Sequence, residues 1–238
     1  AADGEALIRL TATPGAARAP RAAGLYHTAL RVPSRLELAR VLLHLANQGV
    51  ALQGVADHGV SEALYLADLE GNGLEIYRDY PEDDWPVDEQ NKLVMGTWEL
   101  DLDGLLAELG PEPPPFGGLH PDSQVGHVHL AASQLEPEVA FFQRLLGLNL
   151  VMRYGPAAAF LAFGEYHHHV GINTWATAGG PPNDPAKAGL RRITLRYPQA
   201  EEREAALARL AEAGQAAQAV EQGWLARSPS GIQVFLSD

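Results

Sequence analysis

Residues 57–79 read DHGVSEALYLADLEGNGLEIYRD and decide how the rest of the chain is interpreted. Apolar positions alternate on both sides of a segment rich in Asp, Gly and Asn, which predicts strands at 61–67 and 74–77 joined by a turn. Successive side chains of a strand point to opposite faces, so Glu75 faces away from its apolar neighbours. A carboxylate on the inner face of a sheet is costly unless it is paired, hydrogen-bonded or bound to a metal. Glu75 is therefore the first candidate functional residue.

The same succession of one strand, one helix and three strands recurs along the chain. The first complete copy begins at Gly24, and its helix is capped by Ser34 and ends at Gly49. Further copies begin at Gly126 and Gly189. Paired βαβββ units form curved mixed sheets around clefts, so the predicted fold class is α+β with repeated units.

The copies predict how the chain is divided into domains. The predicted parts are residues 1–20, 21–79, 80–124 and 125–238. The first holds a lone strand at 5–11 and a linker, interpreted as the end of an N-terminal unit that the sequence otherwise lacks. The second is a complete unit, and the third is a connector with a helix at 102–109. The fourth is a domain of two units, 125–177 and 188–238.

Composition narrows the classes of function. A formal net charge of −13 argues against nucleic acid or an anionic membrane as the main partner. The absence of cysteine excludes disulfides, zinc–thiolate sites and a cysteine nucleophile. No stretch approaches the roughly eighteen apolar residues of a membrane span, and no signal-peptide pattern opens the chain, so we expect a cytoplasmic location. A sheet edge left open beside the first complete copy would favour a homo-oligomer.

His27 and Glu75 are the candidate metal ligands of the first complete copy. Both lie on the concave face if the first and last strands of the copy are neighbours. A histidine and a carboxylate are two parts of the 2-His-1-carboxylate set of non-haem Fe(II) enzymes. The missing histidine is expected in the first strand of the absent N-terminal unit. The alternative is a simple hydrogen bond between the two side chains.

The second copy carries a candidate histidine cluster. Four histidines alternate on two strands that we expect to be neighbours: His127, His129, His167 and His169. Such a cluster suits Zn²⁺, Ni²⁺ or Cu²⁺. The alternative is a set of hydrogen-bonded histidines that responds to pH.

The second and third copies do not repeat the pair of His27 and Glu75. In the second copy, the residues aligned with His27 and Glu75 are His129 and Asn173. In the third copy, they are Arg192 and Gln233. Neither copy is therefore expected to hold the His-His-Glu set.

Several segments together resemble the vicinal oxygen chelate superfamily, and within it the catechol-2,3-dioxygenase-like proteins related to type I extradiol dioxygenases. The segments are GLYHTALRVPS (24–34), ADHGVSEALYL (56–66), GNGLEIYRD (71–79), RDYPEDDWP (78–86) and YHHHVGINTW (166–175). The resemblance covers essentially the whole chain. It implies the glyoxalase/bleomycin resistance/dioxygenase fold.

The resemblance also implies a function, a metal-dependent ring-cleaving dioxygenase that acts on a catechol-like vicinal diol with O₂. His27 and Glu75 would be metal ligands, and the family's D-H-x-V-S motif makes His58 the residue that hydrogen-bonds the substrate or oxygen. Tyr65 and Tyr77 would line the substrate pocket. The implied cofactor is Fe(II), with Mn(II) or Zn(II) as alternatives.

Two other functions stay open at the level of sequence. A non-catalytic protein could use the cleft to sequester a small molecule. A glyoxalase-like isomerase or lyase would require a second carboxylate ligand in place of a histidine.

Overall fold

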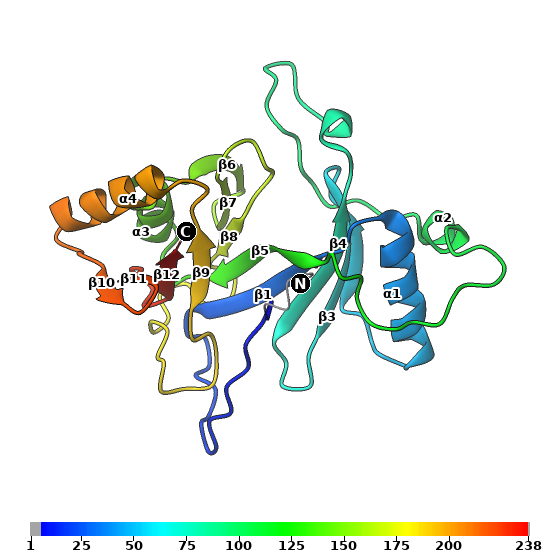
Figure 1. Cartoon of the computed structure of the whole chain (residues 1–238), viewed down its shortest axis with the longest axis horizontal. Coiled ribbons are helices and arrows are strands. Elements are labelled where there is room, and N and C mark those ends of the chain that lie inside the picture. Colours follow the sequence, from blue (N-terminus) through cyan, green and yellow to red (C-terminus); the bar gives the residue numbers. More distant parts are fainter. Residues whose placement is uncertain (1–5, 238) are drawn as a thin grey trace. The chain divides into compact units, whose positions relative to one another are not determined.

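The structure, a computed structural model, describes residues 6–237 (Figure 1). It divides into two compact units. Of the described residues, one unit comprises 6–11 and His27–His127, and the other comprises Ala12–Tyr26 and 128–237. None of the helices in the described part is long and apolar enough to cross a membrane.

The first copy of the repeat contains the predicted elements. They are β1 (Gly24–Arg31), α1 (Arg35–Asn47), β2 (Gly54–Asp57), β3 (Ser61–Ala67) and β4 (Gly73–Asp79). The strand order is β2-β3-β4-β1, in which β1 and β4 are parallel and the other pairs antiparallel. The first and last strands of the copy are therefore neighbours, as the candidate metal pair requires.

Local sequence explains where α1 begins and ends. The hydroxyl of Ser34 accepts a hydrogen bond from the backbone N–H of Glu37, which satisfies one of the free donors of the first turn. Gly49 follows the helix with φ of 67°, a left-handed conformation that glycine adopts without strain. Leu38 and Val41 are buried on its apolar side.

The connector after β4 contributes to the core of the first unit. It contains the 3₁₀ helix η1 (Glu82–Asp84) and α2 (Leu102–Ala107), which Asp101 caps through the backbone N–H of Gly104. Leu105 of α2 is fully buried in the same cluster as Leu38 and Leu64. The predicted helix in the connector is thus present.

The second copy of the repeat lies mostly in the other unit. Its elements are β5 (Gln124–Ala131), α3 (Leu135–Ala140), β6 (Asn149–Tyr154), β7 (Ala158–Ala162) and β8 (Val170–Asn173). A π-helical turn, η2 (Phe141–Leu145), continues α3. The strand order is β5-β8-β7-β6, and β5 and β8 are parallel.

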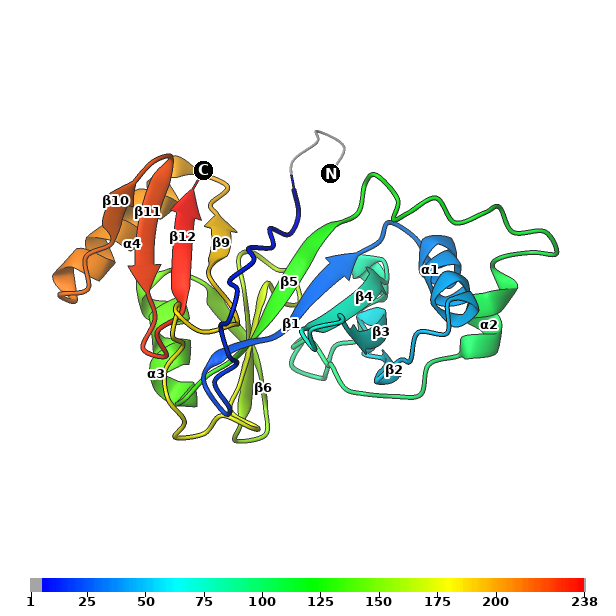
Figure 2. The same ribbon diagram turned by 90° about the horizontal axis from the view of Figure 1, so that it is seen from below.

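The third copy forms a separate four-stranded sheet. Its elements are β9 (Ile193–Arg196), α4 (Ala200–Glu212), β10 (Gln218–Val220), β11 (Gly223–Arg227) and β12 (Gln233–Ser237). The order is β10-β11-β12-β9, with β12 and β9 parallel, and Figure 2 shows the four strands side by side. All three copies thus pair their first and last strands in parallel, and the chain has the glyoxalase/bleomycin resistance/dioxygenase fold.

The strand predicted at 5–11 is not observed in the described residues. Residues 6–11 form no strand, and Leu10 is 82% exposed. Glu5, where the prediction begins, lies outside the described residues. None of the described strands pairs with this segment, and a lone strand cannot satisfy its backbone groups.

Candidate metal centre

His27, Glu75 and His127 bring their side chains together in the first unit. They come from β1, β4 and β5, and the candidate ligand atoms all lie within 4.8 Å of one another. All three side chains are buried. Within residues 6–237, no other group of three His, Cys, Asp or Glu side chains is gathered in this way.

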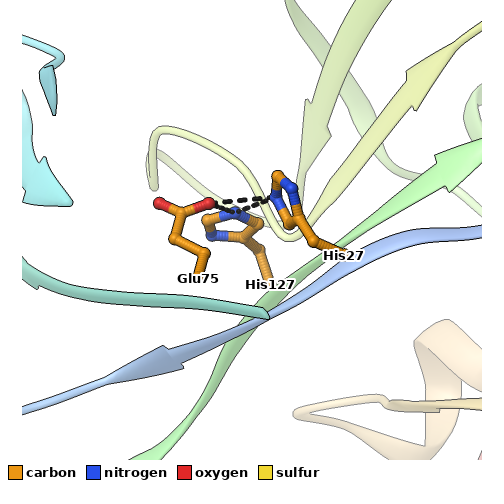
Figure 3. A group of neighbouring side chains, drawn as sticks. All are labelled: His27, Glu75 and His127. Atoms are coloured by element: carbon orange, nitrogen blue, oxygen red, sulfur yellow. Dashed lines mark hydrogen bonds and ion pairs between the residues drawn. The ribbon is translucent and has the colours of Figure 1, made fainter. Parts of the chain in front are cut away.

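The polar atoms of the three side chains converge (Figure 3). Oε2 of Glu75 lies 2.9 Å from Nε2 of His27 and 3.1 Å from Nε2 of His127. The two Nε2 atoms are 3.4 Å apart. Two imidazole nitrogens and one carboxylate oxygen are the donor set that suits a divalent transition metal, so these residues fit such an ion.

Gly126 and Tyr77 determine where His127 lies. Tyr77 is fully buried, and its ring centroid is 5.1 Å from that of His127. A Cβ atom on Gly126 would collide with the hydroxyl of Tyr77, so only glycine allows β5 to pass at this distance. Tyr77, expected in the substrate pocket, therefore lies against β5 and the ring of His127.

The two histidines keep the carboxyl group of Glu75 ionised. Burial by itself would raise the pKa of the Glu75 carboxyl, but the charge of His127 and the hydrogen bonds from His127 and His27 together outweigh it. The pKa of Glu75 consequently lies well below its ordinary value. The carboxylate is therefore anionic at neutral pH and supplies a negative charge at the point where the three side chains meet.

His58 is connected to this group through Tyr65. Its Nδ1 atom lies 2.6 Å from the carbonyl oxygen of Gly96, and its Nε2 atom lies 2.7 Å from the hydroxyl of Tyr65. A carbonyl only accepts, so Nδ1 donates, and in the neutral ring Nε2 accepts from the Tyr65 hydroxyl. The ring centroid of Tyr65 is 5.7 Å from that of His27.

The connector residue Gly96 was not predicted to contribute to the site. It meets His58 because the backbone of Trp98 pairs with that of Asp57 at the end of β2. No motif in the sequence marks this contact.

The four histidines of the predicted second cluster do not gather into one group. His127 joins His27 and Glu75, whereas His129 packs among the rings of Tyr26, Phe160 and Trp175. The other two histidines make separate contacts: Nδ1 of His167 lies 2.8 Å from Nδ1 of His168, and Nδ1 of His169 accepts from the backbone N–H of Phe163. Both precede β8, so they do not share the alternation of that strand on which the prediction depended.

The positions of the helix N-caps show which residues of the first strands correspond in the three copies. Each of three residues lies seven positions before an N-cap: His27 before Ser34, His127 before Gln134, and Arg192 before Gln199. His127 therefore takes the place of His27 in the second copy, and the assignment of His129 to that place was wrong. Arg192 keeps its predicted place in the third copy.

The pairing of the first and last strands shows which residues of the last strands correspond to Glu75 in the other two copies. The pairs that correspond in the three copies are Ala29 with Glu75, His129 with Gly171, and Thr194 with Phe235. Gly171 and Phe235 therefore take the place of Glu75, and the assignment of Asn173 and Gln233 was wrong. The second and third copies lack a carboxylate there, as predicted.

Comparisons with known proteins agree with the fold. No family model matches the sequence. A crystal structure from Bacillus subtilis subsp. subtilis str. 168, described as a "putative dioxygenase", superposes with a TM-score of 0.59 at 15% identity. The alignment covers 93% of this chain, and the chain spans 64% of the length of that protein. This likeness shows a shared fold.

The repeated βαβββ units and this fold define a protein of the vicinal oxygen chelate class. A closer relative is the protein named "Catechol-2,3-dioxygenase" of Bacillus subtilis (strain 168), which is 39% identical over 232 residues. The alignment covers 96% of this chain and 80% of the relative. The chain therefore belongs to the family of catechol-2,3-dioxygenase-like proteins.

Proposed function

We propose that this protein is a metal-dependent ring-cleaving dioxygenase of the extradiol type, acting on a catechol-like vicinal diol with O₂. The observation that carries the proposal is the convergence of His27, Glu75 and His127 in one buried group. The relative that is 39% identical carries the name "Catechol-2,3-dioxygenase", which supports this substrate class.

His27, His127 and Glu75 would hold the metal, with Fe(II) as the preferred ion and Mn(II) or Zn(II) as alternatives. When bound, the metal would supply the redox chemistry that allows O₂ to react with the ring of the diol. With two neutral imidazoles and the anionic Glu75 as its ligands, a divalent ion would keep a net positive charge, which would favour the binding of an anionic diol. Three protein donors would leave room for small molecules at such an ion.

His58 and Tyr65 would accept the proton that a diol must lose. The hydrogen bond to Gly96 holds the proton on Nδ1 of His58, so Nε2 is an acceptor directed at the Tyr65 hydroxyl. Tyr65 in turn contacts the ring of His27. We infer that His58 accepts a proton through Tyr65, rather than from the substrate directly.

The proposal is tested with anaerobically prepared protein loaded with Fe(II). We expect about one iron per chain in the wild type and its loss in His127→Ala, because two remaining ligands seldom hold such an ion. His129→Ala is the matched control, since that residue is two positions away on β5 and packs among aromatic rings. Retention of iron by His127→Ala, or loss by His129→Ala, would contradict the assignment.

Oxygen uptake after the addition of catechol separates the enzyme from the alternatives. An iron-loaded wild type that binds catechol without consuming oxygen would be a binding protein. The isomerase alternative requires two carboxylate ligands. The group found among the described residues contains only one carboxylate, that of Glu75. Catechol-dependent oxygen consumption that disappears in His127→Ala supports the dioxygenase.

A further inference from the structure

The four-stranded sheet of the third copy has one covered face and one open face. α4 covers the face formed by Ile193, Leu195, Val234 and Leu236, which are buried in the core. The alternate residues of the same strands point to the other face, because side chains alternate along a strand. Several of these residues are exposed or half-buried.

Three side chains with hydrogen-bond donors form a row across this open face. Arg227 of β11 pairs with Gln233 of β12, and continuing the β9–β12 register by one residue places Arg192 on the other side of Gln233. Neighbouring strands lie about 4.8 Å apart, so the Cα atoms of the two arginines are about 10 Å apart. We call Arg227, Gln233 and Arg192 the donor row.

An apolar row lies next to the donor row. Leu225, Phe235 and Thr194 pair across the same three strands, each two residues away from the member of the donor row on its own strand. The guanidinium of Arg192 lies over the ring of Phe235, with its Cζ atom 4.9 Å from the ring centroid. The positions that hold His27 and Glu75 in the first copy thus hold a guanidinium and an aromatic ring here.

The charge of this face is opposite to that of the chain. The chain carries a formal net charge of −13, yet the strands β9, β10, β11 and β12 contain no Asp or Glu. Within the described residues, neither Arg192 nor Arg227 forms an ion pair with a carboxylate. Two exposed guanidinium groups without a protein counter-charge favour an anion, and guanidinium matches the geometry of a carboxylate.

A hollow opens beside the donor row. It has a volume of about 540 Å³, and its lining includes Gln218, Leu225, Arg227 and Gln233. The volume is within the range of sites for small organic ligands. Its lining combines donors with an apolar side chain and includes no acidic residue.

We propose that the open face of this sheet binds a small organic carboxylate. The carboxylate group lies on the donor row, and the apolar part of the ligand lies on Leu225 and Phe235. The site uses none of the residues of the metal centre, so it is a second ligand site whose existence does not depend on the proposed dioxygenase activity.

The test is a titration of the full ¹⁵N-labelled chain with benzoate, observed by backbone and arginine side-chain NMR. Benzamide and inorganic phosphate serve as probes that lack, respectively, the charge and the apolar body. We expect benzoate to shift the signals of Arg192, Arg227, Gln233 and Phe235, and to bind at least about ten-fold more tightly than either probe.

Substitutions of the two arginines of the donor row, compared with a substitution of an arginine outside it, test which side chains hold the carboxylate. Arg192→Gln and Arg227→Gln, singly and together, should weaken benzoate binding by roughly ten-fold or more, because each removes a charge-assisted contact. Arg144→Gln is the control, since Arg144 is an exposed arginine of the same unit that lies outside this sheet. The proposal is overturned if benzoate shifts no signals on this face, if phosphate binds there equally well, or if Arg144→Gln weakens binding as much.

Discussion

The Nε2 atom of His127 lies 3.1 Å from Oε2 of Glu75, although the two residues are 52 positions apart in the sequence. The contact requires β5 to pass close to Tyr77 of β4, and Gly126 allows this approach. Gly126, the residue before His127, is therefore needed for His127 to lie in this position.

Replacing Gly126 should displace His127. In Gly126→Ala the new Cβ would collide with the Tyr77 hydroxyl, so we expect a stability loss of about 1–3 kcal/mol and reduced metal content. Urea unfolding and metal analysis of the same preparation measure both effects. Tyr77→Phe in the Gly126→Ala background removes the colliding oxygen and should restore part of each.

Gly117→Ala is the control for this pair. A Cβ atom there would meet no other atom within 4 Å, and the residue is exposed. Its stability should be unchanged or slightly higher, because alanine restricts the unfolded chain. Equal loss of metal in both alanine variants would show that the collision at Tyr77 is not the cause.

Replacing His58 should separate metal binding from turnover. His58→Gln removes the acceptor nitrogen that faces Tyr65 but leaves His27, Glu75 and His127 in place. If the proposed function is correct, we expect unchanged iron content and a roughly 10²–10⁴-fold lower rate of catechol-dependent oxygen consumption. His120→Gln, outside the site, should change neither quantity, and a normal rate in His58→Gln would exclude the proton role.

Of the ion-pair residues in the first unit, Glu62 should cause the largest loss in the free energy of unfolding when it is replaced. The buried carboxylate lies 2.6 Å from Nη2 of Arg78 and 2.9 Å from Nε of Arg35. Glu62→Gln leaves two guanidinium groups without their charged partner, and we expect a loss of about 3–5 kcal/mol in urea unfolding. Glu136→Gln, which ends the exposed pair with Arg153, should cost about 1 kcal/mol or less.

Glu138 should make the second unit less stable as the pH rises. Burial raises the pKa of its carboxyl, and the hydrogen bonds from Ser228 and Ser230 reverse only part of this effect. The folded state then binds the proton more tightly than the unfolded state, so stability is complete below the unfolded pKa of about 4.3 and is lost as the pH rises through the folded value.

The measurement is the melting temperature of the wild type and of Glu138→Gln from pH 4 to 8. Glutamine stays neutral, so the variant should lack this component, and the wild type should lose stability relative to it with rising pH. The lowered pKa of Glu75 acts in the opposite direction, but it is common to both proteins and cancels in the difference. A difference that is constant over this range would contradict the prediction.

Much of the fold follows from local sequence signals. The cap at Ser34, the glycine after α1 and the alternation around Glu75 predicted elements that the structure contains. No cap or glycine in the sequence marked the π-helical turn after α3. The prediction of a lone strand at 5–11 was wrong, because alternation alone does not provide a partner strand.

The candidate site was only partly predictable. His27 and Glu75 meet as expected, because both belong to one copy whose first and last strands are neighbours. His127 was assigned to a different histidine cluster because it alternates with His129, and the third histidine of the metal site was expected in an N-terminal unit. The close approach of Gly126 to Tyr77 is a contact between distant segments that one sequence does not reveal.

The parallel pairing of β1 with β4 has a consequence for the order in which the first unit folds. The two strands can pair only when the long stretch of chain between them closes into a loop, and contacts of such long sequence separation form slowly. We therefore expect His27 and Glu75 to become neighbours late in folding. An ion that needs both side chains would recognise only the completed unit, so it would slow unfolding without guiding the early steps of folding.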